Sequence, residues 1–160
     1  MSDKKFIEQA IQLAKQNIDA GGRPFGAVVV KNDKVIATGV NQMLELSDPT
    51  AHAELLALRE AGRILGNVKL NDCVVYASGQ PCPMCLAAMR MSGITRIVYA
   101  YSNDDAEAYG LSTASIASIL REEPQNQPGL DFIQLKPDEQ QMPLLYQYWV
   151  NCESTSSKSS

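Results

Sequence analysis

Residues 73–101 read CVVYASGQPCPMCLAAMRMSGITRIVYAY, and this stretch decides the fold class. Its two ends, residues 73–77 and 97–101, are short apolar runs rich in β-branched and aromatic residues, which is the composition of buried strands. Between them, residues 83–91 favour a helix, with a proline in the first turn, where a missing amide hydrogen is harmless. A strand, a helix and a strand in this order predict a crossover onto one shared sheet, and therefore an α/β fold.

The residues before this stretch predict two more helices and a hairpin. Apolar residues recur at helical spacing over residues 3–19, and glycines follow directly. Residues 25–31 and 34–40 are β-branched runs on either side of Asn32-Asp33, which predicts a hairpin with a tight polar turn. Residues 53–65 contain strong helix formers and end at a glycine. We therefore expect helices on both faces of the sheet.

The residues after the stretch predict the end of the domain. They favour a helix at residues 112–122, a last strand at 132–135 and a terminal helix at 142–150. Residues 154–160 (STSSKSS) are a flexible polar tail with no apolar surface to bury. We expect one domain over residues 1–153 and no second domain.

Length and composition exclude several classes of protein. A chain of 160 residues, 45% of them hydrophobic, can bury about two thirds of its unfolded surface in one core, so disorder is excluded. No run approaches the roughly 18 apolar residues of a membrane span. The net charge of -4 argues against a broad basic face that grips nucleic acid. The first residues lack an apolar signal core and carry acids, so we expect a cytoplasmic protein.

Two short motifs bring together ligands for a metal. His52, the only histidine, stands in residues 50–54 (TAHAE) at the start of a predicted helix, and Cys82 and Cys85 stand in residues 81–85 (PCPMC) at the start of another. A helix N-terminus favours the thiolate form that a metal requires. One imidazole and two thiolates leave the fourth position of a tetrahedral Zn²⁺ open to a water, which then becomes a hydroxide nucleophile near neutral pH.

Glu54 supplies the remaining chemistry. A carboxylate beside the zinc-activated water can take its proton and deliver it to a ring nitrogen and then to a leaving amine. The pattern His-x-Glu followed by Pro-Cys-x-x-Cys is the signature of zinc deaminases, in which the glutamate is not a metal ligand. The sequence therefore predicts hydrolytic deamination with Glu54 as general acid and base.

Two other interpretations of the cysteines remain open. A thioredoxin-type redox pair explains Cys82 and Cys85, but it needs neither the upstream His-Ala-Glu nor prolines on both sides of the first cysteine. A closed structural zinc site needs a fourth ligand, for which Cys73 and Cys152 are the remaining cysteines. We expect Cys73 to be a buried strand residue and Cys152 a surface thiol.

From residue 24 to about residue 110 the chain resembles the cytidine and deoxycytidylate deaminase superfamily, and within it the bacterial guanine deaminases and the tRNA-specific adenosine deaminases. The matching segments are PFGAVVV (24–30), GVN (39–41), DPTAHAE (48–54) and PCPMC (81–85). The resemblance implies a three-layer α/β/α fold with a five-stranded mixed sheet, zinc held by the histidine and the two cysteines, and the glutamate as proton shuttle. One residue departs from the pattern, because Gln80 stands where relatives commonly carry glutamate.

The same resemblance implies the substrate contacts. Asn41 would hydrogen-bond the heterocycle, while backbone groups near Ala53 and the side chain of Phe25 would line the pocket. Asp105, or alternatively Asp104, would accept hydrogen bonds from the donors of guanine. Tyr148 belongs to an aromatic terminal segment that resembles one closing over the pocket in guanine deaminases, in known cases from a swapped partner subunit. We therefore expect a homodimer with a nucleobase as its small-molecule ligand.

Three functions are consistent with the sequence. The first is deamination of guanine to xanthine and ammonia. The second is deamination of cytosine, adenosine, guanosine or tRNA adenosine, although residues 138–160 contain one lysine and no arginine, which argues against RNA. The third is an inactive zinc-binding interaction module, which Gln80 favours and the intact Glu54 opposes.

Overall fold

The structure, a computed structural model, describes residues 3–138 and 144–159, and the chain divides into two compact units, Met1–Glu122 and Glu123–Ser160. The sheet lies in the first unit and has four strands in the order β2-β1-β3-β4. Strand β1 is antiparallel to both β2 and β3, and β3 is parallel to β4, so the sheet is mixed. The strands are β1 (Gly26–Lys31), β2 (Lys34–Val40), β3 (Cys73–Gly79) and β4 (Arg96–Tyr101).

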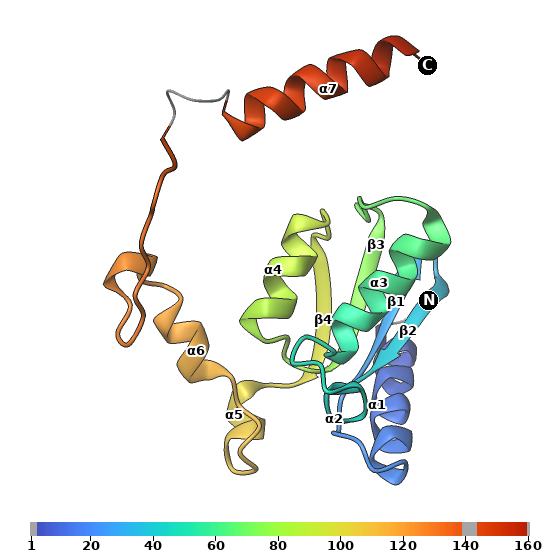
Figure 1. The fold of residues 1–160 in the computed structure, drawn as a ribbon. Helices are drawn as coiled ribbons and strands as arrows, with labels where there is room; N and C mark the ends of the chain where they lie inside the picture. Colours follow the sequence, from blue (N-terminus) through green and yellow to red (C-terminus); the bar gives the residue numbers. More distant parts are fainter. Residues whose placement is uncertain (1–2, 139–143, 160) are drawn as a thin grey trace. The chain divides into compact units, whose positions relative to one another are not determined.

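Helices cover both faces of this sheet and form three layers (Figure 1). Helix α1 (Asp3–Asp19) packs on one face, where Val28 and Val30 of β1 contact Phe6. Helices α3 (Ala53–Leu65) and α4 (Pro83–Met91) pack on the other face with Val29 and Val75. The alternation of inward residues along β1 follows from the two-residue period of a strand. The predicted α/β/α layering is confirmed.

The hairpin between β1 and β2 turns at the two residues that the sequence indicated. Asn32 and Asp33 have φ values of 51° and 61°. A two-residue hairpin turn with positive φ at both positions matches the right-handed twist of the strands, and asparagine and aspartate tolerate this conformation well.

Helix α3 lies unusually close to β2 because Gly39 has no side chain. A Cβ atom at this position would lie 2.3 Å from the carbonyl oxygen of Ala53 and 2.7 Å from the amide nitrogen of Ala57. Both neighbours are backbone atoms of α3, so neither can rotate away. Gly39 therefore fixes the distance between the sheet and the first turn of α3, which carries the residues of the predicted metal site.

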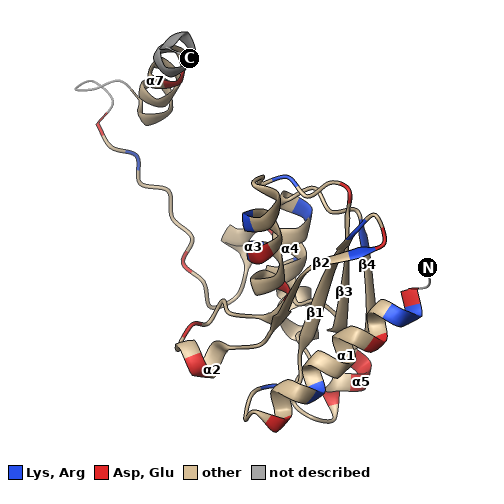
Figure 2. Ribbon diagram, turned by 90° about the vertical axis from the view of Figure 1, so that its right-hand side faces the viewer, with Lys and Arg blue, Asp and Glu red and all other residues tan. Residues whose placement is uncertain are grey.

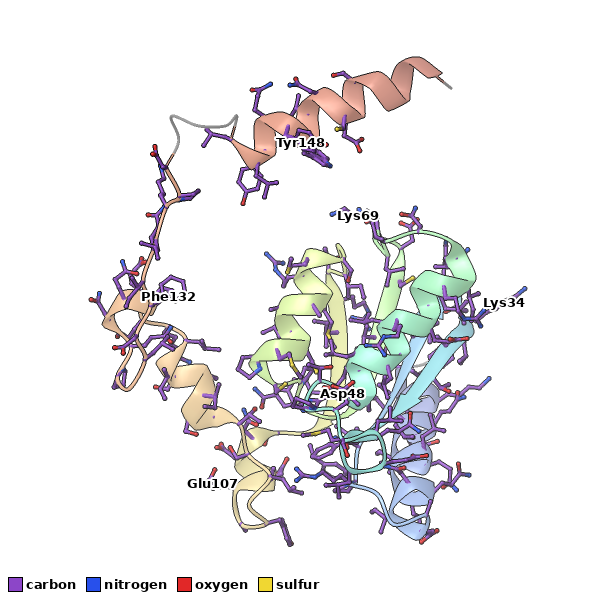
Figure 3. All side chains as sticks on the ribbon, in the orientation of Figure 1. Lys34, Asp48, Lys69, Glu107, Phe132 and Tyr148 are labelled. Atoms are coloured by element: carbon purple, nitrogen blue, oxygen red, sulfur yellow. The ribbon has the colours of Figure 1, made fainter. Side chains whose placement is uncertain are left out.

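The predicted fifth strand is wrong. Residues 132–135 have no strand partner within the described residues, and Phe132, Ile133 and Leu135 are 62%, 81% and 92% exposed (Figure 3). A short apolar run becomes a strand only when a neighbouring edge pairs with it and buries one of its faces. The sheet in this structure has four strands, and the run from 132 lies in the second unit.

Several element boundaries also differ from those predicted. The helix expected at residues 112–122 is shorter, α6 (Ala114–Ile119), and two short helices were not expected, α2 (Met43–Leu46) and α5 (Asn103–Glu107). Their few residues show no clear periodicity, and α5 depends on its cap instead.

The second unit has a 3₁₀ turn, η1 (Pro124–Asn126), and helix α7 (Leu145–Ser159), which continues through residues 154–159, where the sequence suggested a polar tail. Residues 142 and 143 of the expected terminal helix lie outside the described residues. None of residues 123–138 and 144–154 in this unit is buried within the chain, and most of them are exposed. Within the described ranges, no helix combines the length and apolar character needed to cross a membrane.

Gly39→Ala tests the close approach of α3 to the sheet. We expect the free energy of unfolding to fall by about 2–3 kcal/mol, because the new methyl group collides with helix backbone and overpacking is poorly relieved there. Urea unfolding followed by circular dichroism measures the change. Thr38→Ala, at the exposed neighbouring position of β2, is the matched control and should cost less than about 1 kcal/mol. Equal stability of the two variants would contradict the close approach.

Candidate active site

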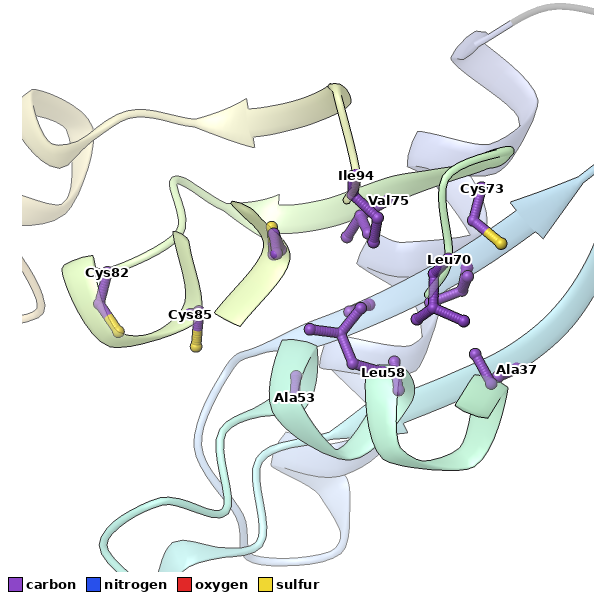
Figure 4. Close-up of a cluster of buried hydrophobic side chains, with 14 residues drawn as sticks. Ala37, Ala53, Leu58, Leu70, Cys73, Val75, Cys82, Cys85 and Ile94 are labelled. Carbon is purple, nitrogen blue, oxygen red and sulfur yellow. The ribbon is translucent and has the colours of Figure 1, made fainter. Parts of the chain in front are cut away.

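Two helix N-termini bring the predicted metal ligands together. His52 is the N-cap of α3, Cys82 is the N-cap of α4, and Cys85 lies in the first turn of α4. Figure 4 shows the side chains of Cys82 and Cys85. The His52 Nδ1 atom is 3.4 Å from the Cys82 Sγ and 3.5 Å from the Cys85 Sγ. Residues from two distant motifs thus converge on one point at the end of the sheet.

The spacing of these atoms fits a zinc ion. With Zn–N near 2.0 Å and Zn–S near 2.3 Å, tetrahedral geometry separates a nitrogen and a sulfur ligand by about 3.5 Å. The two observed separations agree with this value. Among the described residues, these three form the one group of three or more histidine, cysteine or acidic side chains close enough to share an ion. Neither Cys73, which is buried, nor Cys152, which is exposed, belongs to it. Three protein ligands leave one position open.

The electrostatics of the three ligands favour metal binding. Hydrogen bonds, first from Cys85 and then from His52, lower the pKa of the Cys82 thiol to about 4, so this sulfur is a thiolate at neutral pH. The hydrogen bond to Cys82 in turn raises the pKa of His52. Without a metal, the proton of Cys85 is held by its thiolate neighbour, and its pKa is raised. A bound cation replaces these protons, so metal binding releases them.

Glu54 lies beside the triad but is not part of it. It occupies the first turn of α3 and is buried, with 7% of its surface exposed. Burial is the main cause that raises the pKa of its carboxyl group. A carboxyl group with a raised pKa holds a proton more readily than an ordinary one, and a carboxyl group can both accept and donate a proton during one reaction, which is what a deamination requires.

These residues line a pocket of about 230 Å³, a size suited to a small ligand such as a single heterocycle. The predicted residues Phe25, Asn41, His52, Glu54 and Cys82 all contribute to its lining. The sequence did not indicate the other lining residues, which are Arg23, Met43, Gln80 and residues 110–113. Arg23 is the one lysine or arginine among the lining residues. Its place directly before the PFGAVVV segment is a signal that could have identified it from the sequence.

Asn41 is held in one orientation. Its Oδ1 atom accepts a hydrogen bond of 3.1 Å from the amide of Met43, which leaves its amide nitrogen as the group that can donate to a ligand. The Nδ2 atom of Asn17 on α1 donates to the carbonyl oxygens of Asn41, at 2.9 Å, and of Arg23, at 2.8 Å. One side chain thus holds two segments of the pocket lining together.

The other predicted substrate contacts lie elsewhere. Asp105 belongs to the capping box of α5, where its Oδ2 accepts from the amide of Ser102 at 2.8 Å, and it lines a neighbouring pocket of about 290 Å³. Asp104 lines neither pocket. Ala53 is completely buried and is not among the lining residues of the metal pocket. Tyr148 lies exposed on α7, in the second unit (Figure 3). The contacts of Asp105 and Tyr148 with a substrate stay predictions.

The metal site predicts a clear difference between two cysteine variants. Cys85→Ser should lower the zinc content well below one ion per chain, because a hydroxyl is a much poorer zinc ligand than a thiolate. Cys152→Ser, the same change at an exposed cysteine, should keep about one zinc per chain. Elemental analysis of protein purified without chelator measures both. Full zinc in Cys85→Ser would contradict the ligand set.

Comparisons with known proteins agree with this geometry. Residues 1–101 match the family model of the cytidine and deoxycytidylate deaminase zinc-binding region. The guanine deaminase of Bacillus subtilis is 38% identical over 152 residues, which are 94% of this chain and 96% of that protein. A tRNA-specific adenosine deaminase of Aquifex aeolicus is 38% identical over 99 residues, 62% of this chain and 66% of that protein.

Solved structures give the same result for the fold. The X-ray structure of the Bacillus subtilis guanine deaminase superposes with a TM-score of 0.84 at 37% identity, covering 94% of this chain and 95% of that one. A guanine deaminase from Nitrosomonas europaea superposes with a TM-score of 0.67 at 33% identity, covering 70% and 65%. With the metal triad and Glu54 in place, the chain belongs to the cytidine and deoxycytidylate deaminase family and is a zinc-dependent aminohydrolase.

Proposed function

We propose that this protein deaminates guanine at C2, giving xanthine and ammonia. The observation that carries the proposal is the buried Glu54 beside a three-ligand metal site in a pocket sized for one base. The similarity to a guanine deaminase over 94% of the chain supports guanine rather than another heterocycle. Similarity to the tRNA-specific adenosine deaminase of Aquifex aeolicus covers a smaller share of the chain, 62%.

The metal ligands and Glu54 have different roles in this reaction. Zinc held by His52, Cys82 and Cys85 would supply a Lewis acid that makes water a nucleophile at neutral pH. The Glu54 carboxylate takes the proton released from that water and gives it to the ring nitrogen next to C2. The same carboxyl group then takes the second proton from the oxygen that is now bonded to C2 and delivers it to the amine. The C2–N bond breaks as ammonia leaves, the oxygen becomes the carbonyl of xanthine, and the ring nitrogen keeps the first proton.

Other residues of the pocket would bind and orient the base. The Asn41 amide nitrogen donates to an acceptor on the purine edge. Because the hydrogen bond from Met43 already fixes this side chain, binding the base costs less conformational entropy. The Phe25 ring contributes an apolar wall against the heterocycle. We keep Asp105 as the partner of the guanine donors. This contact requires the Asp105 carboxylate to point away from its cap on α5, where it is hydrogen-bonded in this structure.

We also propose a homodimer in which Tyr148 and its aromatic neighbours close over the pocket of the partner subunit. Leu145, Tyr146, Tyr148 and Trp149 are 60–81% exposed on α7, which is an unusual surface for a helix without a partner. Residues 1–153 would then act as one deaminase domain, completed by the second copy. The four unpaired cysteines fit a reducing compartment such as the cytoplasm.

Deamination of adenosine in tRNA is the second enzymatic candidate. RNA binding needs basic residues gathered along one surface. Figure 2 shows Lys and Arg interspersed with Asp and Glu, for example along α1, and residues 138–160 add one lysine. We therefore place a free base ahead of RNA.

Ammonia release from a panel of substrates tests the proposal. We expect guanine to have a higher specificity constant than guanosine, cytosine, cytidine, adenine, adenosine and a tRNA anticodon stem, all measured in one buffer. Higher turnover of any competitor moves the substrate assignment to that compound. Absence of turnover with every member of the panel in zinc-loaded protein would favour an inactive zinc-binding module.

Glu54→Gln tests the proton shuttle. The amide has the same size but cannot carry the proton, so turnover should fall by at least about 10²-fold while zinc content and fold stay unchanged. Glu8→Gln, the same substitution at an exposed position of α1, is the matched control and should retain full turnover. Near-normal turnover in Glu54→Gln would remove the role assigned to it.

Light scattering at micromolar concentration tests the assembly. We expect twice the chain mass for the full protein, because the exposed aromatic face of α7 needs a partner surface. A chain of monomer mass with full guanine turnover would contradict closure of the pocket by a partner subunit. It would leave the metal site and Glu54 unaffected.

A further inference from the structure

Gln80 connects the metal-binding motif to the start of helix α5. It stands two residues before Cys82 and lines both the metal pocket and its neighbour. Its side-chain Oε1 accepts a hydrogen bond of 2.9 Å from the backbone amide of Asn103, and its backbone amide donates to the carbonyl oxygen of Tyr101 at 2.7 Å. The mechanism above gives this residue no role.

The hydrogen bond from Asn103 completes the N-terminus of α5. The first amides of a helix lack partners within the helix. In α5, the capping box pairs the amide of Asp105 with the Ser102 Oγ and the amide of Ser102 with the Asp105 Oδ2. The amide of Asn103, the first helical residue, is paired by Gln80 instead. Gln80 therefore replaces a capping group that no residue of α5 itself supplies.

A second hydrogen bond extends the connection to the pocket wall. The Oδ1 atom of Asn103 accepts from the amide of Thr113 at 3.2 Å and from its Oγ1 at 3.5 Å. Thr113 ends the segment 110–113 that lines the metal pocket. Two hydrogen bonds in series thus join Gln80 to this wall.

We infer that Gln80 is a positioning residue. Through Asn103 it fixes the position of residues 110–113, which line the metal pocket, and in this way it determines the affinity of the pocket for the base. This inference rests on the proposed function for its substrate and on the two hydrogen bonds for its mechanism. Glutamine suits the position because its amide oxygen is an acceptor without charge.

Substitutions at residue 80 distinguish the effect of the hydrogen-bond acceptor from the effect of the size of the side chain. Gln80→Met keeps the length of the side chain and removes the acceptor, whereas Gln80→Glu restores an acceptor oxygen. Gln12→Met is the matched control, because Gln12 is exposed on α1 and lines neither pocket. Zinc content, steady-state kinetics with guanine and amide hydrogen exchange are measured for each.

For Gln80→Met we expect KM to rise about three- to tenfold, the factor that one lost hydrogen bond produces, while kcat changes less than about twofold. Zinc content should stay at the value of the control. Exchange at the amides of Asn103 and Thr113 should become faster, because Asn103 loses its acceptor and its less firmly held side chain then binds the amide of Thr113 less tightly. Gln80→Glu should restore both the slow exchange and a KM within about twofold of the unsubstituted protein.

Asn103→Leu tests the order of the two hydrogen bonds. This variant removes the acceptor for Thr113 but keeps the backbone amide that Gln80 binds. Exchange should therefore become faster at residue 113 and stay slow at residue 103. Combined with Gln80→Met, it should raise KM by less than the product of the two single effects, because both changes disrupt one connection.

Three outcomes would overturn the inference: exchange and KM in Gln80→Met equal to those of Gln12→Met, loss of zinc in Gln80→Met, or failure of Gln80→Glu to restore slow exchange. Amide exchange needs no turnover, so it tests the connection independently of the substrate. An unsubstituted protein that does not act on guanine but shows the expected exchange pattern contradicts the proposed function alone.

Discussion

Three ligand atoms on two helices have to meet at one point, and the rest of the site depends on this requirement. Helices α3 and α4 pack on the same face of the sheet, and both begin at the end where the pocket lies. Gly39 lets α3 approach β2 closely enough for its backbone to contact the strand. This packing brings the His52 Nδ1 within 3.4 and 3.5 Å of the two sulfur atoms. The position of Glu54, two residues further along α3, follows from the same packing.

The elements with strong periodicity could be predicted from the sequence almost to the residue. Helices over residues 3–19, 53–65 and 83–91 have the boundaries of α1, α3 and α4, because periodic apolar residues and flanking glycine or proline define them locally. The fifth strand failed because pairing depends on a neighbouring edge, which local composition does not report. Helix α5 carries a recognisable signal in Ser102 and Asp105, whose spacing is that of a capping box.

In the candidate site, too, the features set by local sequence could be predicted and those set by long-range contacts could not. The metal ligands and Glu54 lie in compact motifs, so residue types and spacing were enough to predict which residues meet. Residues 110–113 have no motif of their own and reach the pocket through the side-chain hydrogen bonds of Gln80 and Asn103. Asp105 was assigned to the substrate from a resemblance in sequence, whereas the structure pairs its carboxylate within α5. Long-range contacts of this kind are set by the tertiary structure.

Zinc K-edge X-ray absorption of protein purified without chelator tests the convergence of the two helices most directly. The account predicts two sulfur ligands at about 2.3 Å and the remaining nitrogen or oxygen ligands at about 2.0–2.1 Å, which is the shell of one histidine, two cysteines and an exchangeable position. A shell of four sulfur atoms, or one without sulfur, would contradict it.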